Sequence, residues 1–142
     1  MPDPEAVAAI VREWIVKAEN DLRNAAHTLT LKEDVPTDTI CFHAQQCIEK
    51  YLKAFLVSRS IAFTKTHSLR VLMELIPQDS RPSLDGNAQD QITKYAAVSR
   101  YPDAGLDIPL PEARKAVATA RRIRKEVRRL LPRAALRRKR KP

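Results

Sequence analysis

The sequence has few of the residues that break helices or cross-link a chain: its 142 residues include two glycines and two cysteines. The ten prolines lie between the apolar periodic segments or at the ends of the chain. Because glycine and proline inside an element are what most strongly oppose a helix, this placement favours a helical protein. We find neither strand-like alternation nor an internal repeat.

The shortage of cysteine and of long apolar runs bounds the compartment. Cys41 and Cys47 are six positions apart on one expected helix, so they point in different directions and cannot reach disulfide geometry. Unpaired cysteines suit a reducing compartment. No apolar run approaches the roughly 18 residues of a membrane span, and acids stand where a signal peptide would be basic. We therefore expect a soluble cytoplasmic protein.

Hydrophobic residues make up 44% of the chain, enough for a single domain with a buried core. They recur at spacings of three and four, the period of an amphipathic α-helix. This pattern predicts an all-α, up-and-down bundle of about five helices within residues 1–131. A basic tail at residues 132–142 follows, which we expect to be disordered. The expected helices cover residues 5–29, 39–56, 66–76, 88–99 and 111–131.

The second expected helix carries the most unusual polar residues. Four of them share one stripe beside the apolar face, and we call them the polar row: His43, Gln46, Lys50 and Lys53. Such a row either satisfies itself or holds a partner. Asp38 precedes the helix and is expected to cap its first turn. The first helix presents Asn20, Asp21 and Asn24, for which contact with the row and ordinary solvated surface are the two alternatives.

Positive charge is concentrated near the C-terminus. From residue 114 onward, fourteen Lys and Arg stand against one acid, whereas residues 1–113 carry twelve against sixteen. Such a cluster is expected to attract phosphate backbones, with affinity that falls as salt rises. A solvated charge run and a contact for an acidic partner protein are the alternatives. The candidate nucleic-acid-binding residues are Arg121, Arg122, Arg128, Arg129, Arg137, Arg138, Lys139 and Arg140.

No signature of a metal or cofactor site is present. The two cysteines and three histidines lack ligand spacing, and the chain has no P-loop. We expect no metal and no cofactor, so a nucleotide would be held by side chains and helix ends.

Four segments of the sequence resemble the HEPN family, named for higher eukaryotes and prokaryotes nucleotide-binding. They are residues 14–22 (WIVKAENDL), 42–54 (FHAQQCIEKYLKA), 66–69 (THSL) and 99–103 (SRYPD). The resemblance implies a helical bundle that commonly forms a homodimer with a groove between protomers. Members are metal-independent ribonucleases or non-catalytic relatives that bind nucleotides or RNA. Many are encoded with a minimal nucleotidyltransferase as a toxin-antitoxin pair, so such a partner is expected here.

The ribonuclease branch of that family relies on an Arg followed by four to six residues and a His. Here Arg23 and His27 are separated by three residues, Arg59 and His67 by seven, and no His follows Arg100. Because an RNA 2′-hydroxyl needs a base to take its proton, the sequence favours a non-catalytic or weakly catalytic protein. The alternatives are a ribonuclease with a displaced base, His43 or His67, and a protein-interaction module that uses the basic tail. The candidate ligand-binding residues are His43, Gln46, Lys50, Arg100 and Tyr101.

Overall fold

The computed structural model describes residues 2–98, 100, 102 and 107–137. These residues form helices and connecting segments, with no strand among them. The helices are α1 (Pro4–Thr28), α2 (Thr37–Ser58), α3 (Leu69–Leu75), a 3₁₀ turn η1 (Gln78–Ser80), α4 (Gly86–Thr93), α5 (Tyr95–Val98), α6 (Leu110–Arg128) and α7 (Arg133–Leu136). The prediction of an all-α bundle is confirmed.

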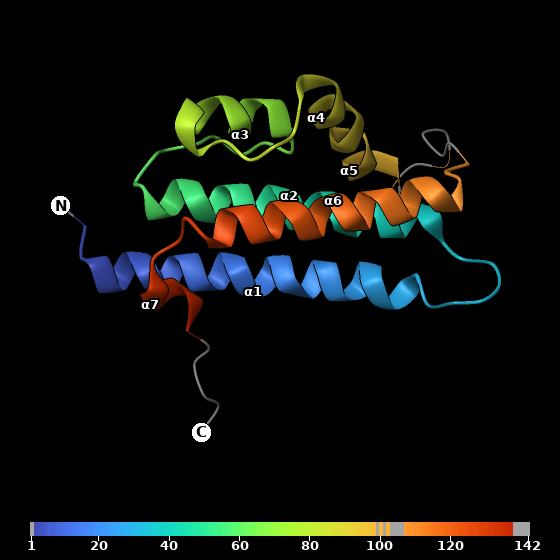
Figure 1. Cartoon of the computed structure of the whole chain (residues 1–142), viewed down its shortest axis with the longest axis horizontal. Helices are drawn as coiled ribbons and strands as arrows, with labels where there is room; N and C mark the ends of the chain where they lie inside the picture. The colour runs from blue at the N-terminus through green and yellow to red at the C-terminus, as the bar shows by residue number, and fades with distance from the viewer. Residues whose placement is uncertain (1, 99, 101, 103–106, 138–142) are drawn as a thin grey trace.

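Three long helices build the body of the molecule (Figure 1). Helix α2 returns antiparallel to α1 after the loop at residues 29–36. The chain then travels back along α3, α4 and α5, so α6 runs in the same direction as α2 and opposite to α1 (Figure 1). Helix α2 contacts α1, α3, α4, α5 and α6, and it is therefore the centre of the fold.

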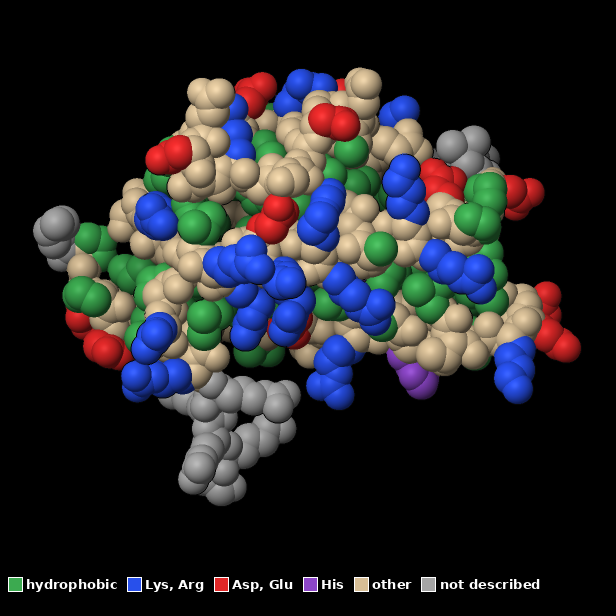
Figure 2. Space-filling model, in the orientation of Figure 1, with side chains coloured by type: hydrophobic (Ala, Val, Ile, Leu, Met, Phe, Trp, Pro, Cys, Tyr) green, Lys and Arg blue, Asp and Glu red, His purple; other side chains and the backbone are tan. Residues whose placement is uncertain are grey.

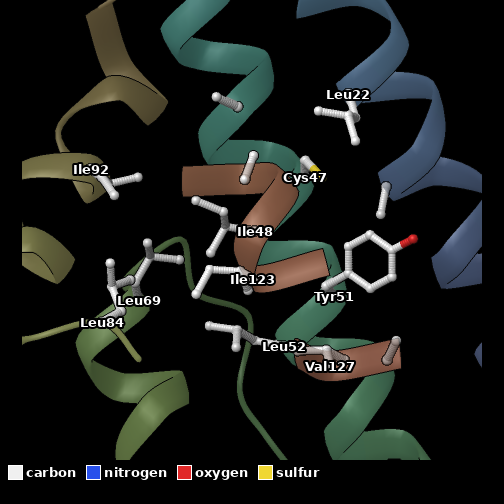
Figure 3. Close-up of a cluster of buried hydrophobic side chains, with 14 of the residues drawn as sticks. Leu22, Cys47, Ile48, Tyr51, Leu52, Leu69, Leu84, Ile92, Ile123 and Val127 are labelled. Atoms are coloured by element: carbon white, nitrogen blue, oxygen red, sulfur yellow. The ribbon is translucent and has the colours of Figure 1, made fainter. Parts of the chain in front are cut away.

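Buried side chains of α1, α3, α4 and α6 pack along α2 (Figure 3). Tyr51, Leu52 and Ile48 of α2 are fully buried, and Ile123 and Val127 of α6 pack over them. The helical period places these residues on the core faces of their helices. None of the described helices is long and apolar enough to cross a membrane.

The helix starts follow local hydrogen bonding, with one difference from expectation. Asp3 caps α1, and Ser68 caps α3 by accepting from the Val71 N–H at 3.3 Å. Helix α2, however, begins at Thr37 directly after Pro36, so Asp38 lies inside its first turn. The Asp38 carboxylate accepts from the Thr39 N–H, an amide of that turn, at 2.8 Å, so it serves the first turn as expected, but from inside the helix and not from the N-cap position, which Pro36 holds. Pro36 fixes a backbone angle that lets the helix start earlier.

The expected helix at residues 88–99 is two helices in the structure. Asp85 caps α4 by accepting from the Ala88 N–H at 2.8 Å, so α4 starts two residues early. Thr93 ends α4: its hydroxyl donates to the Gln89 carbonyl and accepts from the Leu69 N–H at 3.0 Å. A threonine that bonds its own preceding turn and a neighbouring helix weakens helix continuation, which accounts for the break before α5.

The first residues of the expected basic tail are helical, whereas the sequence analysis predicted disorder for the whole tail. Residues 133–136 form α7, which crosses α1 near its N-terminal end (Figure 1). Ala135 is buried against α1, and Arg12 Nη1 donates to the Ala134 carbonyl oxygen at 2.6 Å. The short apolar run Ala134-Ala135-Leu136 supplies enough contact to hold the segment. The remaining tail residues, 138–142, lie outside the described part of the chain.

Candidate functional site

The polar row of α2 is largely engaged with acids inside the molecule. Asp21 of α1 is buried and accepts from two members of the row. His43 Nδ1 lies 2.8 Å from Asp21 Oδ1, and Lys50 Nζ lies 2.5 Å from Asp21 Oδ2. Because a carboxylate only accepts, His43 must carry its proton on Nδ1, which leaves Nε2 available. Of the two alternatives for Asp21, contact with the polar row is therefore the one found in the structure, not a solvated surface position.

The other two members of the row gather around Glu49, whose side chain is only 3% exposed. Lys53 Nζ lies 3.0 Å from Glu49 Oε2, and the Gln46 amide donates to Gln45 Oε1 at 2.6 Å. Gln45 in turn donates to Glu49 Oε1 at 3.1 Å. Within the described residues, no buried side-chain polar atom is left without a partner. A buried charge pair is costly unless it is fully hydrogen-bonded, and here that condition is met.

The remaining members of the predicted ligand-binding set are placed elsewhere. Arg100 is exposed in the turn after α5, where its N–H donates to the Ala97 carbonyl oxygen at 3.1 Å. Its side chain makes no hydrogen bond or ion pair with His43, Gln46 or Lys50. Tyr101 lies outside the described residues. His43 and Lys50 are partly exposed beside Asp21, whereas Gln46 is buried, so the row offers a ligand two of its predicted groups.

A larger feature lies on the other side of α1, where α1, α6 and α7 enclose a groove of about 1300 Å³. We call it the basic groove, because the described residues that line it include seven Lys and Arg and one acid, Glu19. Figure 2 shows Lys and Arg side chains gathered over α6 and toward α1 on this face. The cations that line the groove are Arg12, Arg23, Arg121, Arg124, Lys125, Arg128 and Arg137.

Glu19 organises the centre of the basic groove. Arg124 Nε lies 2.9 Å from each Glu19 carboxylate oxygen, and Arg124 Nη2 lies 2.7 Å from Oε1. Arg128 Nη1 approaches Glu19 at 3.7 Å and donates to the Tyr51 hydroxyl at 3.3 Å. Burial alone would raise the pKa of Glu19, but hydrogen bonds from Arg124 and Tyr51 and the charges of both arginines outweigh it, so the pKa is lowered. The acid is therefore ionised at neutral pH and holds two arginines in fixed positions.

Other cations of the basic groove are free to meet a ligand. Arg23, Arg121 and Lys125 are exposed, and their side chains make no hydrogen bond or ion pair with the described residues. Apolar side chains of α1 and α7 also line the groove: Ile15, Val16, Leu22, Ala26, Ala135 and Leu136. The groove thus combines a positive field with a partly apolar floor, a surface suited to a phosphorylated chain.

The structure divides the predicted nucleic-acid-binding residues into three groups. Arg121, Arg128 and Arg137 line the basic groove. Arg122 on α6 and Arg129 just after its end are exposed outside the groove lining, and residues 138–140 lie outside the described part of the chain. The predicted set lacks four cations of the groove: Arg12, Arg23, Arg124 and Lys125. The helical period of α1 places Arg12 and Arg23 on one face, eleven residues or about three turns apart, but only the packing of α6 shows which face that is.

No group of three or more potential metal ligands occurs among the described residues.

A family model for the HEPN domain matches residues 11–130, which covers most of the chain. The chain belongs to the HEPN family. This HEPN chain also resembles two solved structures. TT1696 from Thermus thermophilus is 29% identical, with a TM-score of 0.68 over 85% of this chain and 98% of that one.

ST0689, an archaeal HEPN homologue, is 26% identical, with a TM-score of 0.63 over 86% of this chain and 98% of that one. No curated protein matches the sequence. Both neighbours share the helical fold, and the HEPN family is of nucleotide-binding and ribonuclease type. The resemblance seen in the sequence is confirmed.

Proposed function

We propose that this HEPN protein is a non-catalytic RNA-binding component that holds its ligand in the basic groove. The observation that carries the proposal is the concentration of seven cationic side chains against one acid in a single groove. The acid is itself committed to Arg124 and Arg128, so it does not repel a phosphate from the exposed cations. The choice of RNA rather than another polyanion is supported by the family to which the chain belongs.

The composition of the groove favours recognition of the backbone rather than of bases. None of the described residues that line it is aromatic, and stacking on aromatic rings is how proteins hold the bases of single strands. Phosphate contacts carry no sequence information, so binding is expected to be weakly sequence-dependent and strongly salt-dependent.

Matched charge variants test this proposal. The first replaces three exposed groove cations, Arg23, Arg121 and Lys125, with alanine. The control replaces three exposed cations outside the groove, Lys32, Lys94 and Arg114, with alanine. Both proteins have the same net charge. Fluorescence anisotropy with a labelled RNA of about 20 nucleotides should show at least a tenfold weaker affinity for the groove variant and a smaller change for the control. Equal losses in the two variants would reduce the effect to net charge and refute a groove site.

A second candidate function, metal-independent RNA cleavage, is favoured by one observation. The Asp21–His43 pair has the arrangement that orients a general base: the carboxylate holds Nδ1, and Nε2 is left to accept a proton. The guanidinium that would stabilise the phosphate in this family is expected at Arg100, which makes no contact with His43. We therefore propose binding without cleavage.

Incubating the protein with RNA in the presence of EDTA separates the two candidates. Intact RNA supports a binding protein. RNA cleavage that is lost in both His43→Ala and Arg100→Ala would support the ribonuclease, with the displaced base identified as His43.

The partners we propose follow from family membership alone. The resemblance described in the sequence analysis implies a homodimer and, as for many family members, a minimal nucleotidyltransferase as the other half of a toxin-antitoxin pair. We propose both for this chain. Light scattering of the purified protein should give twice the chain mass of 16.1 kDa. Co-expression with the product of a neighbouring nucleotidyltransferase gene should yield a complex that survives gel filtration. If the purified protein instead carries an acidic protein and no RNA, that result would support a protein-interaction module that uses the basic tail.

A further inference from the structure

A second pocket, of about 530 Å³, lies between α1, α2 and the connector that precedes α3. We call it the Trp14 pocket. It is lined by Trp14, Lys53, Phe63, Lys65, Thr66 and His67. Along α1, Trp14 and Asp21 share one side, whereas Arg12, Glu19 and Arg23 lie about half a turn away on the side of the basic groove. The Trp14 pocket is therefore separate from the groove and adjoins the buried end of the polar row.

Two aromatic rings form one wall of the Trp14 pocket. The Trp14 and Phe63 ring centres are 6.2 Å apart at an interplanar angle of 66°. Lys53 Nζ lies 5.6 Å from the Trp14 ring and 5.8 Å from the Phe63 ring, so one cation supports both rings from the interior. Since Lys53 is buried and paired with Glu49, it fixes the wall rather than serving as a free ligand for an anion. The wall is a preformed surface for a flat ring.

Polar groups with free donor or acceptor capacity also line the pocket. His67 Nδ1 lies 2.8 Å from Glu49 Oε1, so Glu49 holds the proton on Nδ1. The His67 side chain is 54% exposed, and its Nε2 is the ring nitrogen left to meet a ligand. The Thr66 hydroxyl accepts from the Ser68 N–H at 3.0 Å, which leaves its own proton to donate. Lys65 is exposed at the rim and adds a mobile positive charge.

We propose that the Trp14 pocket binds a nucleoside monophosphate, with the base against Trp14 and Phe63 and the phosphate at Lys65, Thr66 and His67. A pocket of this volume lies in the range of small-ligand sites. A flat hydrophobic ring matches the two aromatic side chains, and a compact anion matches the polar groups of the lining. The same chemistry is offered by a free nucleotide and by the 5′-phosphorylated end of an RNA. The proposal does not rest on the basic groove.

The buried Glu49 network gives the pocket a rigid support. Glu49 accepts from Gln45, His67 and Lys53, and Gln45 also donates to the His67 carbonyl oxygen at 3.2 Å. His67 is thus held by its ring and by its backbone. Burying the charges of Glu49 and Lys53 is costly for folding. Their position directly behind the pocket supplies the rigid support that a preorganised binding site requires.

Trp14 is the only tryptophan of the chain, so its fluorescence reports on this pocket alone. Titration with AMP should change the emission with a saturable curve, whereas adenosine and inorganic phosphate, each with half of the chemistry, should bind at least tenfold more weakly. Short RNAs with a 5′-phosphate or a 5′-hydroxyl identify the source. If the 5′-phosphorylated RNA binds more tightly than AMP, the pocket is assigned to an RNA end. If AMP and this RNA bind with equal affinity, the pocket is assigned to the free nucleotide.

Two substitutions at exposed positions complete the test. Lys65→Ala and His67→Gln should each weaken AMP binding about tenfold, and Lys32→Ala, an exposed lysine just beyond the far end of α1, should leave it unchanged. Thermal unfolding of each variant checks that the fold is kept. A flat titration with AMP and with the phosphorylated RNA, or an affinity unchanged by Lys65→Ala and His67→Gln, would overturn the proposal. The groove variant described above should bind AMP as the wild type does, so failure of one proposal is distinguishable from failure of the other.

Discussion

Arg124 of α6 donates hydrogen bonds from both its Nε and its Nη2 to the Glu19 carboxylate of α1, at 2.7–2.9 Å. This two-point contact joins residues that are 105 positions apart in the sequence, and both residues line the basic groove. A bidentate pair of this kind is stronger and more directional than a single charged contact.

We predict that Glu19→Gln lowers the free energy of unfolding by about 2 kcal/mol at neutral pH, because it removes charged hydrogen bonds at a partly buried site. The folded-state pKa of Glu19 is lowered, so its contribution is complete above the unfolded-state pKa and disappears as the pH falls through the folded-state pKa. Urea unfolding of variant and wild type should therefore converge in acid.

An exposed pair provides the control for this experiment. Asp90 binds Arg70 at 2.7 Å on the surface, and Asp90→Asn should cost less than Glu19→Gln, since water screens that pair. A difference between Glu19→Gln and wild type that stays constant from neutral to acid pH would contradict the ionised pair.

Asp21→Asn should destabilise the fold by about 3 kcal/mol, because it leaves Lys50 and His43 without their shared acid. Adding Lys50→Met should recover part of this loss, since the uncompensated cation is then removed. Chemical denaturation measures both. Asp79→Asn, at an exposed position, is the matched control and should lie within about 0.5 kcal/mol of wild type. A loss no larger than that of the control would show that Asp21 is ordinary surface.

Both cysteines should resist alkylation in the folded protein. Burial, with the nearby charges of Glu112 and Asp38, raises the pKa of Cys41 to about 12, and burial raises the pKa of Cys47 as well. The reactive thiolate is therefore scarce at neutral pH. Titration with a thiol reagent should show no rapid reaction in buffer and two reacting thiols in urea. Rapid modification of the native protein would place a cysteine at the surface.

The sequence predicted the parts of the fold that a helical period can encode. The apolar stripes of α1, α2 and α6 are local patterns, and the row of His43, Gln46, Lys50 and Lys53 does lie along one face of α2. Which neighbour faces that row is decided by packing. Asp21 meets these side chains from another helix, and Glu49 meets them from one turn away on α2. The helical period alone therefore does not reveal the partners.

The candidate sites depend even more on contacts distant in sequence. The basic groove joins Arg23 to Arg121 and Lys125, and the Trp14 pocket joins α1 to the connector at residues 59–68. Counting charges located the positive end of the chain but not the α1 residues that complete the groove. The disorder expected after residue 131 rested on composition, which did not weigh the burial of Ala135 or the hydrogen bond from Arg12.

The salt dependence of RNA affinity tests the central claim most directly. For a single strand, the logarithm of the binding constant falls with the logarithm of salt concentration by about 0.7 for each phosphate contact. Wild type and the Arg23, Arg121 and Lys125 alanine variant are compared from about 50 to 200 mM salt, the range in which such losses are large. The account predicts a steep slope for wild type that becomes shallower by about 2 in the variant. Parallel slopes for the two proteins would contradict an RNA site in the basic groove.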